Sequence, residues 1–363
     1  MKRTNIGIVG CGDISGIYLQ NITTVFSDNL KIIGVCDLIP ERAGKAAGIV
    51  NEAAGASGDC KIYKDMHELF ADPNVDIVLN LTRPYEHYGV GKPAILAGKN
   101  VYSEKPLGAT LDEGLELVAL AKEKGVLLGG APDTFLGAGI QTCGKLIDDG
   151  YIGTPVGATA FMVCRGHESW HPDPEFYYKH GGGPMLDMGP YYITAMVSLL
   201  GGVKAVTGMA RASFPTRLIT SEPKKGTVVD VDVPTYIMGL LEFESGAIGS
   251  IFTTFDAYKA ETPRIEIYGS AGTLSVPDPN TFGGDVRLYR PEEKEFLKMP
   301  LVFPFAENSR ALGLDGMARG LGSGDFKANC GLTLHVLEVM SGIISSGGNR
   351  IEIKNGYKHG NIR

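Results

Sequence analysis

The sequence lacks long apolar runs, basic runs and closely paired cysteines. No stretch approaches the ~18 consecutive apolar residues of a membrane-spanning helix, and the apolar part of the start is too short for a signal peptide. A formal net charge of −7 argues against a nucleic-acid partner. The six scattered cysteines form no CxxC pair, so neither a disulfide framework nor a zinc knuckle is predicted. We expect a soluble, reduced, cytoplasmic protein with a small-molecule partner, and neither a membrane nor a nucleic acid.

The 363 residues are enough for about two domains at roughly 150 residues each. From residue 4 to about 130, short apolar runs alternate with amphipathic stretches, which is typical of βαβ units around a parallel sheet. Beyond residue 155, long alternating segments and a hairpin turn at Ser245 and Gly246 predict an antiparallel sheet. We place the boundary near Pro132, giving an α/β domain over 1–131 and an α+β domain over 132–363. Helices are expected in the second domain at about 136–149, 184–200 and 328–346.

A glycine-rich segment, GCGDIS, follows the first apolar run directly and opens a helix. Gly10 permits a tight turn, and Gly12 lets the backbone approach a pyrophosphate lying on the helix N-terminus, beside Asp13 and Ile14. The third position of the pattern is Ser15, whose small side chain still allows close packing of helix and strand. In this context the segment predicts a dinucleotide site, and the alternative is a glycine-rich turn without a ligand.

The second strand, KIIGVC, ends at Asp37. An acidic residue at that point accepts hydrogen bonds from the adenosine ribose hydroxyls and would repel a 2′-phosphate. This favours NAD over NADP. Arg42 lies nearby but is equally well explained as a solvated helix charge, and the alternative for Asp37 is a solvated turn aspartate.

The stretch from Thr82 to Leu107, TRPYEHYGVGKPAILAGKNVYSEKPL, resembles the glucose-fructose oxidoreductase, inositol dehydrogenase and MocA (Gfo/Idh/MocA) family. Arg83 replaces the family's usual first proline, while Pro84 follows. The glycine loop, the EKP element and a later GGG element occur in the family's order and spacing. The matching residues are Thr82, His87, Ala97, Gly98, Lys99, Glu104, Lys105 and Pro106.

The resemblance implies a Rossmann domain followed by an α+β domain with a large, open, mainly antiparallel sheet. It implies oxidation or reduction of a secondary alcohol on a sugar, cyclitol or related polyol, with NAD(P) bound in part by Thr82, Pro84 and His87. It also implies a homodimer or homotetramer that associates through the open sheet. A buried, satisfied core histidine is the alternative for His87. Glu104 is expected to be a cofactor-side or a structural residue.

Lys105 follows the strand NVYSE and therefore projects from a carboxyl-end loop, where open α/β sheets place their ligands. An ammonium there can bond the substrate oxygen and the nicotinamide ribose, and it stabilises a developing alkoxide. The alternative is a solvated surface lysine.

Asp187 and Tyr191 lie in HGGGPMLDMGPYY, which resembles the family pattern GGGxxxDxGxH with Tyr191 in place of the usual histidine. The two would share one helix face if Gly189 and Pro190 only kink the helix, and that face could meet Lys105. We expect Tyr191 to transfer the proton, Lys105 to be its electrostatic partner and Asp187 to orient substrate hydroxyls. An alternative assignment makes Lys105 the base. Separately, the alternative for Tyr191 is core packing, and the alternative for Asp187 is a cap at the helix start.

The segment over residues 165–180 contains the single tryptophan of the chain and three of its seven histidines. Trp170, His171 and Tyr177 are candidates for binding a sugar ring and its hydroxyls, and a structural loop plug is the alternative. No metal is expected, because the acidic and histidine residues of the segment include no helical histidine pair and no cysteine. These residues are His167, Glu168, His171, Asp173 and His180.

Three functions compete on this evidence. The first is an NAD(P)-dependent dehydrogenase or reductase of a carbohydrate-like secondary alcohol. The second is a redox-neutral enzyme that uses tightly held NAD to cleave a glycosidic bond. The third is a sugar- or nucleotide-sensing regulator that has kept the fold and lost the chemistry.

Overall fold

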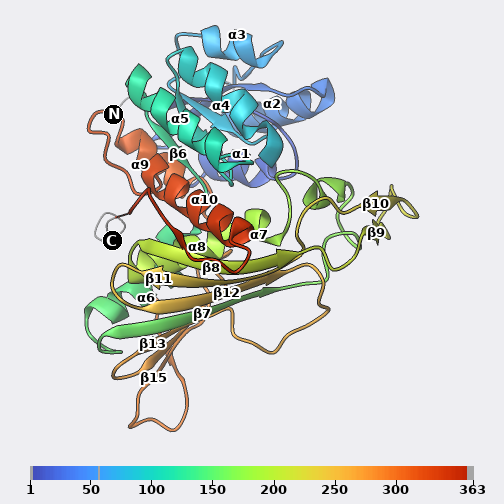
Figure 1. Ribbon diagram of the computed structural model, residues 1–363. Coiled ribbons are helices and arrows are strands. Elements are labelled where there is room, and N and C mark those ends of the chain that lie inside the picture. Colours follow the sequence, from blue (N-terminus) through green and yellow to red (C-terminus); the bar gives the residue numbers. More distant parts are fainter. Residues whose placement is uncertain (1–2, 56–57, 358–363) are drawn as a thin grey trace. The chain divides into compact units, whose positions relative to one another are not determined.

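The computed structural model describes residues 3–55 and 58–357 and divides into two compact units (Figure 1). The first unit contains the chain up to Asp133 together with Asn308–Leu334. The second contains Thr134–Glu307 and the chain from His335 onward. The predicted division at residues 131 and 132 assigned everything that follows to one domain, so it did not include the return of Asn308–Leu334 to the first unit.

The first unit is built on a six-stranded sheet in which every neighbouring pair is parallel. Its strands are β1 (Thr4–Val9), β2 (Leu30–Cys36), β3 (Lys61–Ile62), β4 (Ile77–Asn80), β5 (Asn100–Ser103) and β6 (Leu128–Gly130). The order is β3-β2-β1-β4-β5-β6, and all four residues of β4 are buried. The order reverses between β1 and β4, the switch point where open α/β sheets bind their ligands.

The helices of the first unit follow from the amphipathic stretches between these strands. They are α1 (Ser15–Thr23), α2 (Pro40–Ala54), α3 (Met66–Ala71), α4 (His87–Leu96), α5 (Leu111–Lys124) and α9 (Leu312–Arg319). Helix α1 contacts α2, and α4 contacts α5. Helix α9 packs against β6, and the amide of Gly313 donates to the buried carboxylate of Asp133 at 3.0 Å. Asp133 therefore anchors the returning segment.

The second unit is built on a nine-stranded, mainly antiparallel sheet. Its strands are β7 (Pro155–Val163), β8 (Val203–Arg211), β11 (Tyr236–Phe243), β12 (Ile248–Thr254), β13 (Ile265–Gly269), β14 (Thr273–Val276), β15 (Val286–Tyr289), β16 (Leu297–Met299) and β17 (Ile351–Glu352). Their order is β16-β15-β14-β13-β7-β12-β11-β8-β17, and β7 and β12 form a parallel pair. The hairpin between β11 and β12 confirms the predicted turn, where Gly246 has φ +89°.

Helices α6 (Ala138–Asp148), α7 (Pro184–Asp187) and α8 (Gly189–Leu200) pack against this sheet, and α10 (Cys330–Ser345) adjoins it. Ile343 of α10 lies so close to the sheet that a Cβ at Gly239 would stand 2.8 Å from it. Along β11, buried residues alternate with exposed ones such as Met238 and Leu240. One face of β11 is thus core, and the other is open.

A two-stranded sheet, β9 (Thr216–Leu218) and β10 (Val228–Asp230), extends from the second unit. We call residues 213–231 the β9–β10 arm. The arm contacts the short 3-10 helix Glu175–Tyr178, which belongs to the loop between β7 and α7. In the described part of the chain, none of the helices combines the length and apolar character needed to span a membrane.

Candidate functional site

The loops predicted to bind cofactor and substrate all begin at the carboxyl ends of strands in the parallel sheet. The register aligns Val9 of β1 with Asn80 of β4, and Asn80 with Ser103 of β5. Because all three strands end at this level, the loops that begin at Gly10, at Leu81 and at Glu104 are neighbours. The structure therefore brings the glycine loop, Thr82 and Lys105 to one edge, at the switch point of the sheet.

The glycine loop has room for a ligand close to its backbone. Gly10 has φ +93°, and a Cβ there would lie 2.8 Å from the carbonyl carbon of Leu81, so this position requires glycine. A Cβ at Gly12 would meet nothing within 4 Å. Helix α1 begins at Ser15 without a side-chain cap on its first amides. An open approach to an uncapped helix N-terminus fits a pyrophosphate.

Asp37 stands at the end of β2, beside the glycine loop. Its Oδ2 accepts the amide of Cys11 at 2.6 Å and its Oδ1 accepts the amide of Ile39 at 2.8 Å. Each carboxylate oxygen has a second lone pair, so Asp37 can also accept ribose hydroxyls. Leu38, the next residue, is fully exposed, and Arg42 lies exposed on α2. A carboxylate that can accept ribose hydroxyls, next to an exposed apolar side chain, fits the adenosine half of a dinucleotide.

His87 is buried between two loops. Its Nδ1 lies 2.7 Å from the carbonyl oxygen of Pro106, and its Nε2 lies 3.0 Å from that of Thr82. Burial lowers the pKa of His87, so the ring is neutral at physiological pH. Asn80 supports the same loops, because its Oδ1 accepts the Thr82 hydroxyl and its Nδ2 donates to the His87 carbonyl. A neutral ring can donate to only one of these two carbonyls. Because both ring nitrogens face backbone, the contacts favour the alternative of a buried core histidine.

Glu104 and Lys105 differ in exposure. Glu104 is buried, and its Oε1 accepts the hydroxyl of Tyr18 at 2.7 Å while its Oε2 accepts the amide of Lys105 at 3.0 Å. This favours the structural role for Glu104. Over residues 101–109, Lys105 is the one position that is not buried. The peptide bond between Lys105 and Pro106 is cis, and Pro84 begins a 3-10 helix over Pro84–Glu86.

The segment with Asp187 and Tyr191 is not one kinked helix, so that expectation was wrong. Helix α7 ends at Asp187, and α8 begins at Gly189 with Pro190 in its first turn. Proline has no amide hydrogen and its ring clashes with the preceding turn, which explains the break at Met188. Asp187 is partly exposed, whereas Tyr191 is buried with 6% of its surface accessible.

A histidine that the sequence analysis considered only as a possible metal ligand pairs with Asp187. The Nε2 atom of His167 lies 3.2 Å from Oδ2 of Asp187. Both side chains are mostly buried, with 11% and 15% of their surface exposed. No spacing rule connects residues 167 and 187, so only the fold reveals this pair. Elsewhere, as far as the described residues extend, no group of three or more histidine, cysteine or acidic side chains is arranged to hold a metal ion.

The three substrate candidates of the 165–180 loop lie together around His167. The ring of Tyr177 is 3.9 Å from that of His167 and 5.4 Å from that of His171, measured between centroids. Trp170 is 5.3 Å from His167 and is 62% exposed. An exposed indole next to histidine and tyrosine rings can stack on the apolar face of a sugar.

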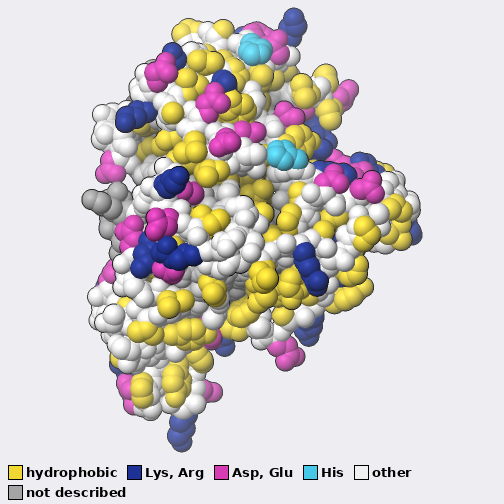
Figure 2. Space-filling view, viewed as in Figure 1, with side chains coloured by type: hydrophobic (Ala, Val, Ile, Leu, Met, Phe, Trp, Pro, Cys, Tyr) yellow, Lys and Arg dark blue, Asp and Glu magenta, His cyan; other side chains and the backbone are white. Residues whose placement is uncertain are grey.

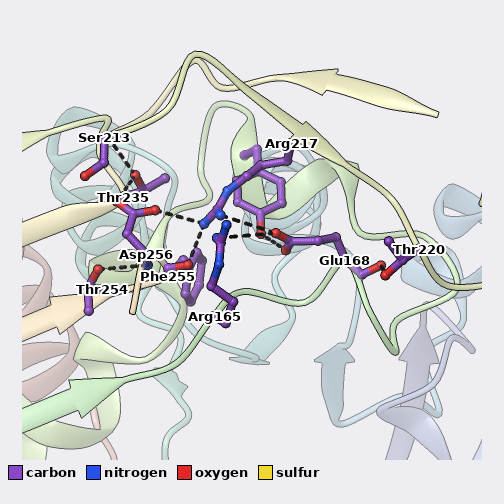
Figure 3. A network of polar contacts seen from close by, with 10 residues as sticks. Arg165, Glu168, Ser213, Arg217, Thr220, Thr235, Thr254, Phe255 and Asp256 are labelled. Carbon is purple, nitrogen blue, oxygen red and sulfur yellow. Dashed lines mark hydrogen bonds and ion pairs between the residues drawn. The ribbon is translucent and has the colours of Figure 1, made fainter. Parts of the chain in front are cut away.

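The loop is held by a buried ionic network, drawn in Figure 3. Arg217 of β9 lies 3.4 Å from Glu168 and 2.9 Å from Asp256, and only 3% of its side chain is exposed. Tyr178 also donates to Glu168, and Thr235 donates to Asp256. One arginine thus connects the loop, the β9–β10 arm and the end of β12. Nothing in the sequence around Arg217 marks it as a buried residue, so only the fold reveals its role.

Comparisons with known proteins place both units in one family. Residues 4–130 match the model of an oxidoreductase family with an NAD-binding Rossmann fold, and residues 140–275 match the GFO/IDH/MocA C-terminal domain. The chain is 27% identical over 270 residues to myo-inositol 2-dehydrogenase of Thermotoga maritima, covering 74% of each protein. It is also 27% identical to D-xylose dehydrogenase of Paenarthrobacter nicotinovorans, covering 64% of this chain and 62% of that protein.

Solved structures share the fold at lower sequence identity. An NAD-binding oxidoreductase from Klebsiella pneumoniae superimposes with a TM-score of 0.81 at 22% identity, over 97% of this chain and all of that one. Levoglucosan dehydrogenase, solved with NADH and L-sorbose, gives a TM-score of 0.79 at 18% identity over 97% and 99% of the two chains. At these identities the likeness concerns the fold. It confirms the predicted combination of a parallel Rossmann sheet and a large, mainly antiparallel sheet.

Proposed function

The chain belongs to the GFO/IDH/MocA family of oxidoreductases with an NAD-binding Rossmann fold, and from this premise we propose that it transfers hydride between a nicotinamide dinucleotide and a secondary alcohol or ketone of a sugar, cyclitol or related polyol. One observation carries the proposal. The open glycine loop, Asp37 and Lys105 lie at one edge of the sheet, where the strand order reverses. Relatives named as xylose and inositol dehydrogenases support the substrate class.

Each site residue has a role in this proposal. Gly10 and Gly12 give the pyrophosphate access to the amides at the start of α1, next to Asp13 and Ile14, and Asp37 accepts the ribose hydroxyls. Bound nicotinamide supplies the hydride acceptor. The Lys105 ammonium stabilises negative charge on the substrate oxygen as its proton leaves.

Substrate binding falls to the second unit in this proposal. Trp170 and Tyr177 provide aromatic faces for the ring, and His171 and Asp187 bond its hydroxyls. Tyr191 is the proton-transfer residue predicted from the sequence, and its burial at the start of α8 limits its access to solvent.

The proposal is tested by mixing the folded protein with NAD⁺ or NADP⁺ and a panel of sugars and cyclitols, and with NADH or NADPH and the corresponding ketones, while following absorbance at 340 nm. Turnover with at least one pair supports it. A folded protein that neither binds nor turns over any of these cofactors with any substrate contradicts it. Glycoside cleavage without net NADH would instead identify the redox-neutral enzyme, and binding without turnover would identify the regulator.

Asp37 should determine the preference for NAD. Replacing it with serine removes charged hydrogen bonds to the ribose, and we expect NADH to bind about 10- to 100-fold more weakly while NADPH binding is unchanged or tighter. Dissociation constants for both cofactors can be measured by energy transfer from Trp170, the only tryptophan. NADPH is the internal control for loop collapse, because Asp37 also holds the Cys11 amide. Glu41→Gln, on the exposed start of α2, controls for charge alone.

We also propose that the open face of the large sheet joins copies of this chain into a dimer or tetramer. Met238 of β11 is paired with Met209 of β8 and with Phe252 of β12, and Leu240 lies two residues further along the same face. Figure 2 shows hydrophobic side chains gathered on the surface of the part of the molecule that contains this sheet. Met209, Met238 and Leu240 are 73%, 52% and 55% exposed. Continuous apolar surface of this kind is typical of protein interfaces.

Replacing Leu240 with glutamate should shift the protein towards monomer, because a charge would be buried at the interface. Light scattering coupled to size-exclusion chromatography measures the mass. Leu96→Glu is the matched control, since Leu96 is 53% exposed on α4 of the first unit. A wild-type protein that is monomeric at micromolar concentration contradicts the proposal.

A further inference from the structure

His167 and Asp187 have the geometry of a histidine base whose ring is oriented by a carboxylate. The carboxylate oxygen and Nε2 are 3.2 Å apart, within reach of a hydrogen bond once the ring is held in place. Asp187 is positioned by the end of α7, where its amide donates to the carbonyl of Gly183 at 3.0 Å. His167 comes from the loop that follows β7. Two separate elements of the second unit therefore meet in this pair.

Aromatic rings fix the plane of the imidazole. The ring centroid of His167 lies 3.9 Å from that of Tyr177, 4.7 Å from that of Phe255 and 5.3 Å from that of Trp170. The contacts with Phe255 and Trp170 are edge-on, at 69° and 84°. Rings on several sides restrict rotation of the histidine about its χ2 angle, so the pair with Asp187 is preorganised.

The carboxylate determines which nitrogen of His167 carries the proton. An ionised carboxylate only accepts hydrogen bonds, so Nε2 donates and Nδ1 keeps a lone pair. Across the described residues, no hydrogen-bond partner faces Nδ1. A histidine held by a carboxylate on one nitrogen and open on the other is the arrangement of a general base.

Other charged groups near the pair are already engaged. Glu168, the next residue of the loop, is paired with Arg217 and Arg165 (Figure 3). It also accepts a hydrogen bond from the Tyr178 hydroxyl. Asp256, which follows Phe255, is also paired with Arg217. Burial raises the pKa of Cys164, so its thiol stays neutral near pH 7. Asp187 is thus the carboxylate that acts directly on the imidazole.

We propose that His167 is the general base of the reaction and that Asp187 is its positioning residue, an inference that rests on the proposed function. In the oxidation, the hydroxyl proton of the substrate passes to Nδ1 of His167, the O–H electron pair forms the carbonyl, and the carbinol carbon loses its hydride to the nicotinamide. The imidazolium then releases the proton to solvent. In the reduction, the same imidazolium protonates the developing alkoxide.

Kinetics of four variants separate this assignment from its competitor. We expect His167→Gln to lower kcat by about 10²- to 10⁴-fold with little change in the Kd for NADH, and to remove the acidic limb of the pH profile. Tyr191→Phe tests the competing proton-transfer residue: a loss as large as that expected for His167→Gln, with His167→Gln near wild-type activity, would assign the proton to Tyr191 and overturn the assignment to His167. His180→Gln is the matched control, because His180 is an exposed histidine at the end of the same loop. Imidazole added to His167→Gly should restore part of the rate, which a purely structural role would not allow.

The tautomer provides a readout that does not depend on turnover. In protein labelled with ¹⁵N-histidine, we expect His167 of the wild type to be protonated on Nε2 at pH 8, and Asp187→Asn to lose this preference while the melting curve shows a folded protein. An active wild type with a fully active His167→Gln, or an Nδ1–H tautomer, overturns the assignment. A folded wild type that turns over no substrate of the panel overturns the proposed function itself, and the base assignment with it.

Discussion

Lys105→Met should lower kcat/KM by at least about 10²- to 10³-fold, the loss that follows removal of one group that stabilises a developing oxyanion. Methionine has similar length and no charge, so the loop after β5 keeps its apolar packing while the substrate oxygen loses its cation. Flanking residues 101–104 and 106–109 are buried, which should preserve the fold in this variant. The rate is measured at 340 nm with the best substrate pair of the panel.

Two further variants show whether the fall in kcat/KM of Lys105→Met comes from the loss of the charge at this position. Lys122→Met removes an exposed lysine from α5 and should leave the rate unchanged. Lys105→Arg keeps the charge but changes its shape, and we expect partial activity. NADH affinity of Lys105→Met should stay within a few-fold of the wild type. If the variant retains full turnover, Lys105 has no part in the chemistry, and if it only loses NADH affinity, its role is in cofactor binding.

The first unit could be predicted largely because its signals are local. Each apolar run is followed by an amphipathic stretch, and parallel strands leave their following loops at one edge. The sequence pattern alone therefore places Gly10 and Asp37 on neighbouring loops, and β1 and β2 do lie next to each other in the sheet. The same locality explains why α6, α8 and α10 lie within the predicted helical ranges.

Contacts between distant residues could not be predicted. Asp133 binds the amide of Gly313, 180 residues further on, and no periodicity connects the two. His167 and Asp187 come together only because the loop after β7 folds back on α7. Pro190 marked a possible kink, but whether a proline bends or ends a helix depends on tertiary packing. Resemblance to a family identified Lys105, whereas these pairings depend on the tertiary fold.

The buried network around Arg217 gives the largest expected effect on stability. Arg217→Leu removes the buried cation that pairs with Asp256 and the nearer of the two cations beside Glu168, and breaking such a buried pair from one side costs about 3–5 kcal/mol. We expect a clear fall in the urea midpoint of the second unit. Emission of Trp170, which belongs to the same loop as Glu168, should change at lower denaturant than in the wild type.

The β9–β10 arm contains its own control. Lys224 of the arm also bridges two carboxylates, those of Asp173 and Glu175, but 39% of its side chain is exposed. Water screens this second triad, so Lys224→Met should cost only about 0–1 kcal/mol. An equal fall in the free energy of unfolding of the two variants would show that burial does not determine the strength of these ionic contacts. A larger loss for Arg217→Leu, with a lower kcat that follows the mobility of the loop, would show that Arg217 positions His167 through Glu168.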